Sequence, residues 1–277
     1  MTAATSPSVP LQARSAPETA NAGAVKAAPR ATSAGPPALR FADVAKRFKD
    51  GTVALTGVDL TIHRGEFVSI VGPSGCGKST LLRIASGLDA VSEGAADVSS
   101  RSVGYVFQDA TLLAWRSVKD NVGLFAELEK VDKATRTRRV AEAIELVGLT
   151  GFEKHLPHEL SGGMRMRTSL ARSLVLDPDL FLFDEPFGAL DEITRERLNE
   201  ELLRLFALSG FAGLFVTHSV AEAVFLSTRV VVMSGRPGRV LADIPVPFDY
   251  PRVPDLRYTP EFGALCGEVS HHLRNAG

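Results

Sequence analysis

The chain has 277 residues, of which 45% are hydrophobic and 23% are charged, which is enough to bury one large core or a core with a subdomain. Its formal net charge of −1 gives no overall field that would favour nucleic acid or an anionic membrane. Its two cysteines argue against a disulfide framework, and no apolar run approaches the ~18 residues that cross a bilayer. We therefore expect a soluble intracellular protein that would need another subunit to span a membrane.

The first 38 residues are rich in Ala, Pro, Ser and Thr and contain almost no large apolar residue. Such a segment buries too little surface to offset the entropy cost of ordering it. The composition therefore predicts a disordered tail over residues 1–38, with a cleaved targeting segment as the alternative.

Beyond the tail, apolar periodicity predicts strands and helices in alternation. Alternating apolar residues or short apolar runs predict strands at 39–48, 55–62, 67–71, 102–107, 180–184, 213–217 and 230–233, with 240–246 as a further candidate. Helical spacing predicts helices at 78–88, 134–147, 163–176, 193–208, 220–226 and 260–274. This order predicts an α/β fold with a mainly parallel sheet, an antiparallel β-subdomain from the first strands, and a helical subdomain over about 111–175.

The run from Gly72 to Thr80 fits the pattern G-x-x-x-x-G-K-[ST] between a predicted strand and a predicted helix. Glycines let backbone N–H groups turn inward around a phosphate chain, and the helix start adds unpaired N–H groups. Lys78 can reach the β- and γ-phosphates, and the Ser79 hydroxyl can ligate Mg²⁺. The predicted nucleotide-binding residues are therefore Gly72, Pro73, Ser74, Gly75, Cys76, Gly77, Lys78, Ser79 and Thr80.

A second candidate phosphate cradle is the run Leu-Ser-Gly-Gly-Met at residues 160–164. Ser161 can cap the following helix, and the adjacent Gly162 and Gly163 leave backbone amides open to an anion. One nucleotide seldom needs two such cradles from the same chain, so we expect the second to serve a nucleotide bound by another copy. An ordinary serine cap is the alternative.

An apolar strand at 180–183 ends in two acids, Asp184 and Glu185. In a P-loop protein, Asp184 can hold Mg²⁺, and Glu185 can accept a proton from an attacking water or orient it. Two solvated charges at a strand end are the alternative.

Gln108 and His218 each follow a predicted strand of the parallel sheet. Ligands gather at the carboxyl ends of such strands, so we expect both side chains near the nucleotide. A purely structural role is the alternative for His218.

Together with Ala189-Leu190-Asp191, these motifs follow one another in the order found in the ATP-binding cassette (ABC) ATPases. The sequence resembles that family over residues 39–235. The resemblance implies a P-loop NTPase core, hydrolysis of ATP with Mg²⁺, and two cassettes paired head to tail around two ATP molecules. It implies an ATPase domain over 39–246 and a Pro-rich extension with a helix over 247–277.

The resemblance also implies roles for single residues. Ser161, Gly162 and Gly163 would contact the nucleotide of the second copy, and Asp191 would cross the dimer contact. Phe48 would stack on adenine, where Tyr is commoner. Gln108 would link Mg²⁺ and water to the membrane partner, and His218 would hydrogen-bond to the γ-phosphate. Catalysis would then rest on Glu185, His218, Gln108 and Lys78, and Mg²⁺ on Ser79, Gln108 and Asp184.

Within the family, the runs at 108–116, 162–165 and 236–240 are similar to importers of nitrate, taurine and alkanesulfonates, and thiamine-precursor importers share much of the pattern. Ala114 and Met166 depart from that branch, which usually has Pro and Gln there. Trp115 is expected either in a groove for a permease helix or in the core.

This likeness implies an importer ATPase on the cytoplasmic side of the inner membrane. Its partners would be a second copy, permease subunits and, indirectly, a periplasmic or extracellular solute-binding protein, with no nucleic acid. The alternatives are a non-transport cassette, a P-loop small-molecule kinase and a cassette that binds ATP without turnover.

Overall fold

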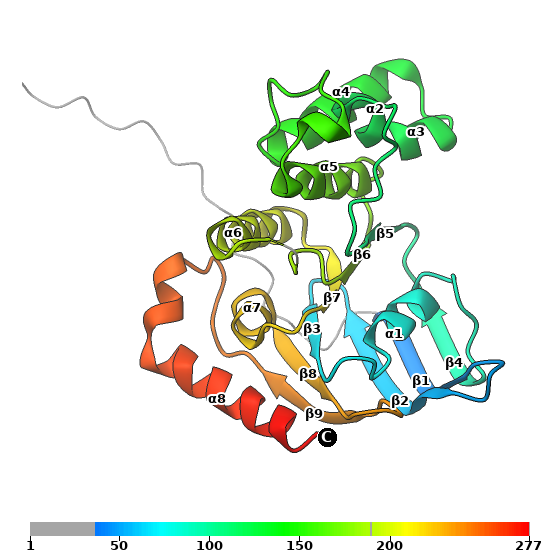
Figure 1. The fold of residues 1–277 in the computed structure, drawn as a ribbon, viewed down its shortest axis with the longest axis vertical. Coiled ribbons are helices and arrows are strands. Elements are labelled where there is room, and N and C mark those ends of the chain that lie inside the picture. The colour runs from blue at the N-terminus through cyan, green and yellow to red at the C-terminus, as the bar shows by residue number, and fades with distance from the viewer. Residues whose placement is uncertain (1–36, 189, 277) are drawn as a thin grey trace, which may run out of the picture.

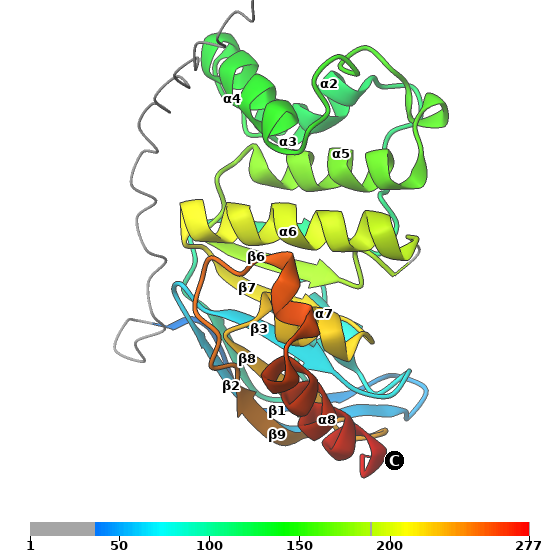
Figure 2. The ribbon, with the colours of Figure 1, turned by 90° about the vertical axis from the view of Figure 1, so that its left-hand side faces the viewer.

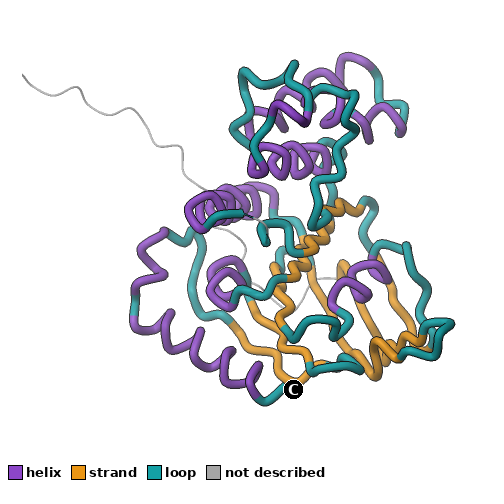
Figure 3. Tube along the Cα trace, in the orientation of Figure 1, coloured by secondary structure: helices purple, strands orange, loops and turns teal. Residues whose placement is uncertain are grey.

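The structure is a computed structural model that describes residues 37–188 and 190–276. Two sheets form the body of the molecule, and a group of helices extends from one end of the larger sheet (Figures 1 and 3). Residues 1–36 of the predicted tail lie outside the described residues. Its last two residues, Pro37 and Ala38, belong to the first strand, which begins at Pro37 rather than at the predicted Leu39.

The smaller sheet is antiparallel, with the order β2-β1-β4. It consists of β1 (Pro37–Arg47), β2 (Val53–His63) and β4 (Glu93–Val98). The sequence did not predict β4, because this edge strand is largely exposed and carries no alternating apolar pattern. The predicted antiparallel β-subdomain is therefore present, with one strand more than expected.

The larger sheet has the order β5-β6-β7-β3-β8-β9, in which all neighbours are parallel except β8 and β9. Its strands are β3 (Phe67–Val71), β5 (Val103–Val106), β6 (Leu180–Asp184), β7 (Ala212–Val216), β8 (Arg229–Met233) and β9 (Val240–Pro245). The carboxyl ends of β3, β6 and β7 lie side by side, because Asp184 pairs with Val216 and Ile70 also pairs with Val216. This edge therefore gathers the segments that carry the P-loop, Glu185 and His218.

Both faces of the larger sheet are covered, as the apolar strands predict. On one face Phe67, Phe183 and Phe215 form an aromatic core with side chains of α6 (Glu192–Ser209) and α7 (Val220–Leu226). On the other face Ile70 and Leu182 pack with α1 (Lys78–Ala85) and the smaller sheet. Helix α1 contacts β6 and β7 of the larger sheet and β4 of the smaller one, and Figure 1 shows α6 and α7 on the opposite side of the larger sheet. These layers confirm the predicted fold class.

The helical subdomain comprises α2 (Val118–Val122), α3 (Leu124–Leu128), α4 (Lys133–Leu146) and α5 (Gly162–Leu174). In Figures 1 and 2 it lies beyond α6, with α5 facing α6. Arg172 of α5 joins it to the segment after Gln108, because its buried guanidinium donates to the carbonyls of Ala110 and Thr111 over 3.1 and 3.0 Å.

The C-terminal extension continues through a short 3-10 helix (Pro254–Tyr258) to α8 (Pro260–Arg274), which packs on α7, β8 and β9. The buried Arg252 donates to the carbonyls of Val224, Phe225 and Ser227 at the carboxyl end of α7. The extension thus fixes the helix that follows His218. None of the described helices is long and apolar enough to cross a bilayer.

Candidate nucleotide-binding and catalytic site

The P-loop connects β3 to α1 in a conformation that requires glycine. Gly77 has φ 102°, and a Cβ there would lie 2.6 Å from Leu55 Cδ2 and 2.9 Å from the Ala54 carbonyl oxygen. Gly75 has φ 73°, also in the left-handed region that disfavours side chains. Cys76 between them is buried, so its side chain packs beneath the loop rather than into it. The loop is therefore built from the backbone turns that the motif predicted.

Lys78 lies at the centre of this loop. Its buried ammonium donates to the carbonyl oxygens of Gly72 and Pro73 over 2.8 and 3.0 Å. These bonds hold the positive charge beside the cavity in which a phosphate chain would lie. An ammonium has three donors and rotatable bonds, so Lys78 can exchange a carbonyl for a phosphate oxygen.

Ser79 and Asp184 meet at the edge of this loop. The Ser79 hydroxyl donates to Asp184 Oδ1 over 2.8 Å, and the Tyr105 hydroxyl donates to Asp184 Oδ2 over 3.4 Å. Burial raises the pKa of the Asp184 carboxyl above its ordinary value. Hydroxyl and carboxylate oxygens are the donors that Mg²⁺ prefers beside phosphates, so these residues fit the predicted metal.

Glu185 and His218 lie next to each other because they follow adjacent strands. Asp184 pairs with Val216, and the Glu185 amide continues the ladder by donating to the Val216 carbonyl over 2.9 Å. His218 Nδ1 then lies 3.1 Å from Glu185 Oε1. Glu185 has φ 46°, which is uncommon for a residue with a side chain and marks a position held by its surroundings. The His218 side chain is 65% exposed, so it is open to a ligand or partner at the surface.

A cavity of about 370 Å³ brings the predicted nucleotide residues together. Its lining includes Phe48, residues of the P-loop, Gln108 and Glu185. The P-loop residues that line it are Ser74, Gly75, Gly77, Lys78, Ser79 and Thr80. Segments far apart in sequence, from Phe48 to Glu185, thus converge on one polar cavity.

The other predicted residues do not line this cavity: Gly72, Pro73, Cys76, Asp184 and His218. Ser161, Gly162, Gly163 and Asp191 line a different cavity of about 380 Å³ between α5 and α6. Ser161 Oγ accepts from the Met164 amide over 3.2 Å, and Asp191 Oδ1 accepts from the Thr194 amide over 3.0 Å. Each therefore caps its own helix. The structure does not bring the second phosphate cradle to the P-loop of the same chain.

Sequence reasoning missed Thr52, Ala54 and Arg236, which also line the P-loop cavity. The run at 236–240 was noted only for its likeness to one branch of a family. Arg236 lies on the turn between β8 and β9, about 160 residues beyond the P-loop, and no local pattern indicates that the two segments meet.

The comparisons with known proteins agree with this geometry. A sequence model described as ABC transporter matches residues 55–188. A putative ATP-binding protein of Brucella abortus is 41% identical over 242 residues, which cover 85% of this chain and 93% of that protein. The aliphatic sulfonates import ATP-binding protein of Bacillus cereus is 42% identical over 220 residues, which cover 76% of this chain and 86% of that protein.

Solved structures give the same result. The dimeric ATP-binding cassette MJ0796, in a post-hydrolysis state bound to ADP and Pi, is 30% identical with a TM-score of 0.68, covering 76% of this chain and 99% of that chain. CbiO1 of Clostridium perfringens, part of the ABC transporter complex CbiONQ, is 26% identical with a TM-score of 0.71, covering 86% of this chain and 96% of that chain. The chain therefore belongs to the ABC transporter family, as an ATP-binding cassette that hydrolyses ATP.

Proposed function

We propose that the chain is the ATPase subunit of an importer for a small solute of the nitrate, sulfonate or taurine kind, or a thiamine precursor. The observation that carries this proposal is the cavity that joins the P-loop, Gln108 and Glu185 in a chain 42% identical to an aliphatic sulfonate import ATPase. The subunit would act at the cytoplasmic face of the membrane, bound to a separate permease.

In the proposed reaction, ATP lies in this cavity with its phosphates on the P-loop amides. Lys78 turns from the carbonyls of Gly72 and Pro73 toward the β- and γ-phosphate oxygens. Mg²⁺, when bound, offsets the charge of those oxygens, and Ser79 and Asp184, with Gln108 close by, are the residues that would hold it.

Glu185 has the proposed role of general base. Its carboxylate orients a water molecule toward the γ-phosphorus and accepts its proton as the new P–O bond forms and ADP leaves. The exposed side chain of His218, 3.1 Å from Glu185 Oε1, would hydrogen-bond to the γ-phosphate. Ser161 does not line this cavity. This supports a second proposal, that Ser161, Gly162 and Gly163 of another copy complete the binding site for the γ-phosphate.

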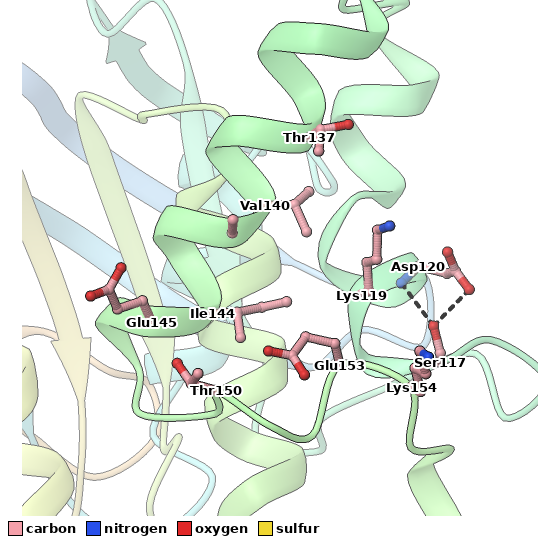
Figure 4. A pocket seen from close by; sticks show the side chains of 11 residues that line it. Ser117, Lys119, Asp120, Thr137, Val140, Ile144, Glu145, Thr150, Glu153 and Lys154 are labelled. Atoms are coloured by element: carbon pink, nitrogen blue, oxygen red, sulfur yellow. Dashed lines mark hydrogen bonds between the residues drawn. The ribbon is translucent and has the colours of Figure 1, made fainter.

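A groove in the helical subdomain is the proposed docking site for the permease (Figure 4). It has a volume of about 950 Å³ and lies between α2, α4 and the loop after α4. Val140, Ala141 and Ile144 give it an apolar floor, and the rim carries charged side chains such as Lys119 and Glu153. An apolar floor with a charged rim suits an amphipathic helix.

Trp115 does not belong to the core, because its side chain is 76% exposed, and the packing alternative is therefore wrong. It lies two residues before Ser117 of the groove, where a docked helix would cover it.

The docking proposal is tested by filling the groove. Ala141→Trp should abolish solute uptake in cells while the isolated subunit keeps its basal ATPase rate. Glu142→Trp adds the same side chain at an exposed neighbouring position that does not line the groove, and it should leave uptake unchanged. Equal uptake by the two variants would contradict the proposal.

The importer proposal is tested by growth. A deletion strain should lose growth on particular sulfur or nitrogen sources, and the native gene should restore it. A Glu185→Gln gene should not, although the protein accumulates. Full growth of the deletion strain on every such source would contradict import of these solutes, and rescue by Glu185→Gln would contradict a need for hydrolysis.

A further inference from the structure

Arg236 places a second cationic side chain at the P-loop. Its Nε–H donates to the Gly75 carbonyl oxygen over 3.1 Å, and its side chain lines the same cavity as Lys78, Phe48 and Glu185. A Cβ at Gly75 would lie 3.1 Å from Arg236 Nη2, so the guanidinium lies directly against the loop backbone. No role so far described for this site uses this residue.

The turn that carries Arg236 is held in place on two sides. The Gly238 amide donates to the Ala54 carbonyl over 2.9 Å, and the Thr56 amide donates to the Gly238 carbonyl over 3.1 Å. A Cβ at Gly238 would lie 1.9 Å from the Cys76 carbonyl oxygen, so the turn contacts the P-loop as closely as its backbone allows. The position of Arg236 is therefore set by the fold.

Most of the donors of this guanidinium are unused. An arginine side chain carries five N–H donors, and one of them is bonded to Gly75. Among residues 37–188 and 190–276, no carboxylate forms a salt bridge with Arg236. A cationic fork with free donors, beside a loop that presents its amides to phosphate, matches a phosphate group in charge and geometry.

We propose that Arg236 is a further nucleotide-binding residue, whose guanidinium binds the polyphosphate chain. The inference rests on the proposed nucleotide site and extends it with a residue from the turn between β8 and β9. The base is a second feature that a guanidinium could contact, by stacking on its ring, and the test separates the two.

The test measures binding by calorimetry with Mg²⁺ and two ligands, a non-hydrolysable ATP analogue and inorganic tripolyphosphate, which has no base. Arg236→Ala should weaken both ligands by the same factor, about 10-fold or more, because a charge-assisted hydrogen bond is lost. The loss should shrink at high salt, since the side chain is exposed and its charge is screened. Arg236→Lys should recover only part of the affinity, because it keeps the charge and loses the fork.

Arg239 provides the matched control. It is an exposed arginine on the same turn that does not line the cavity, so Arg239→Ala should bind as the native chain does. Native affinity in Arg236→Ala would overturn the inference. A loss confined to the ATP analogue would also overturn it, because the contact would then be with the base. Full recovery by Arg236→Lys would overturn the bidentate contact.

Lys78→Ala separates this inference from the proposed site itself. If the native chain binds both ligands and Lys78→Ala weakens them, the site stands, and the Arg236 result is judged alone. If Lys78→Ala binds as the native chain does, the nucleotide site itself is wrong.

Discussion

The two halves of the candidate site differ in how their side chains are engaged. At the carboxyl edge of the larger sheet, residues from different strands contact one another: Ser79 bonds to Asp184, and Glu185 lies beside His218. Between α5 and α6, Ser161 and Asp191 bond only to amides of the helices that they begin. The side chains of the first half already contact one another across strands, whereas the second half is a pair of helix starts that no part of the same chain's P-loop reaches.

This difference explains what the pairing of cassettes would add. The first half gathers the residues that are proposed to hold a triphosphate, a metal and a water. The second half offers backbone amides and a dipole, which are suited to an anion that its own chain does not supply. The proposed head-to-tail dimer would give each half the partner that it lacks.

Among single substitutions, the largest loss of ATPase turnover is expected from a change in the first half of the site. Glu185→Gln should reduce turnover about 10²–10⁴-fold, the usual contribution of a general base, while nucleotide affinity stays near native. The amide keeps the shape of the side chain but cannot accept the proton. Single-turnover rates and equilibrium binding measured on the same preparation check this, and near-native turnover would remove Glu185 from that role.

A smaller effect is expected in the second half. Ser161→Ala removes a helix cap and should lower the free energy of unfolding by about 1 kcal/mol. Asp191→Ala should cost a similar amount, since Asp191 caps α6 in the same way. Denaturant titration measures both.

Nucleotide binding by single protomers, measured at concentrations too low for two chains to pair, gives a sharper comparison of the two halves of the site. Under those conditions Ser161→Ala should bind nucleotide as the native chain does, because Ser161 lies outside the P-loop cavity. Weaker binding by separated protomers would show that the two halves meet within one chain.

The smallest effect concerns the pH dependence of stability. Burial raises the pKa of Asp184 in the folded state above its unfolded value, so the native fold holds this proton more tightly than the unfolded chain. The contribution of Asp184 to the stability of the fold is therefore greatest below its unfolded-state pKa. It is lost as pH rises through its folded-state pKa. Asp184→Asn should remove this loss, raising Tm at neutral pH with little change at pH 3. A native Tm equal to or above that of the variant at neutral pH would contradict this.

Sequence patterns predicted the parallel sheet and the P-loop because both are local: apolar runs mark buried strands, and the glycine spacing marks the turn. Strand β4 was missed because an exposed edge strand has no apolar periodicity. Arg236 was missed because the turn that carries it reaches the P-loop only through tertiary packing. Trp115 could not be assigned from the sequence, because a tryptophan near a helix start is compatible with a core or a surface position, and the structure exposes it.

The division of the pocket between two copies is tested most directly by mixing two inactive variants. Lys78→Ala disables the P-loop half. Gly162→Asp places an anion in the other half, and it should fold, because the nearest atoms to a Cβ there lie 3.8 and 3.9 Å away. In a mixed head-to-tail pair, one site combines both defects and the other has neither.

We therefore expect each variant to be inactive alone and a 1:1 mixture to recover about a quarter of the native rate, since half of the randomly formed pairs hold one intact site of two. Native and doubly mutated chains give the upper and lower limits of the assay. A mixture that stays as inactive as its components would contradict the shared pocket.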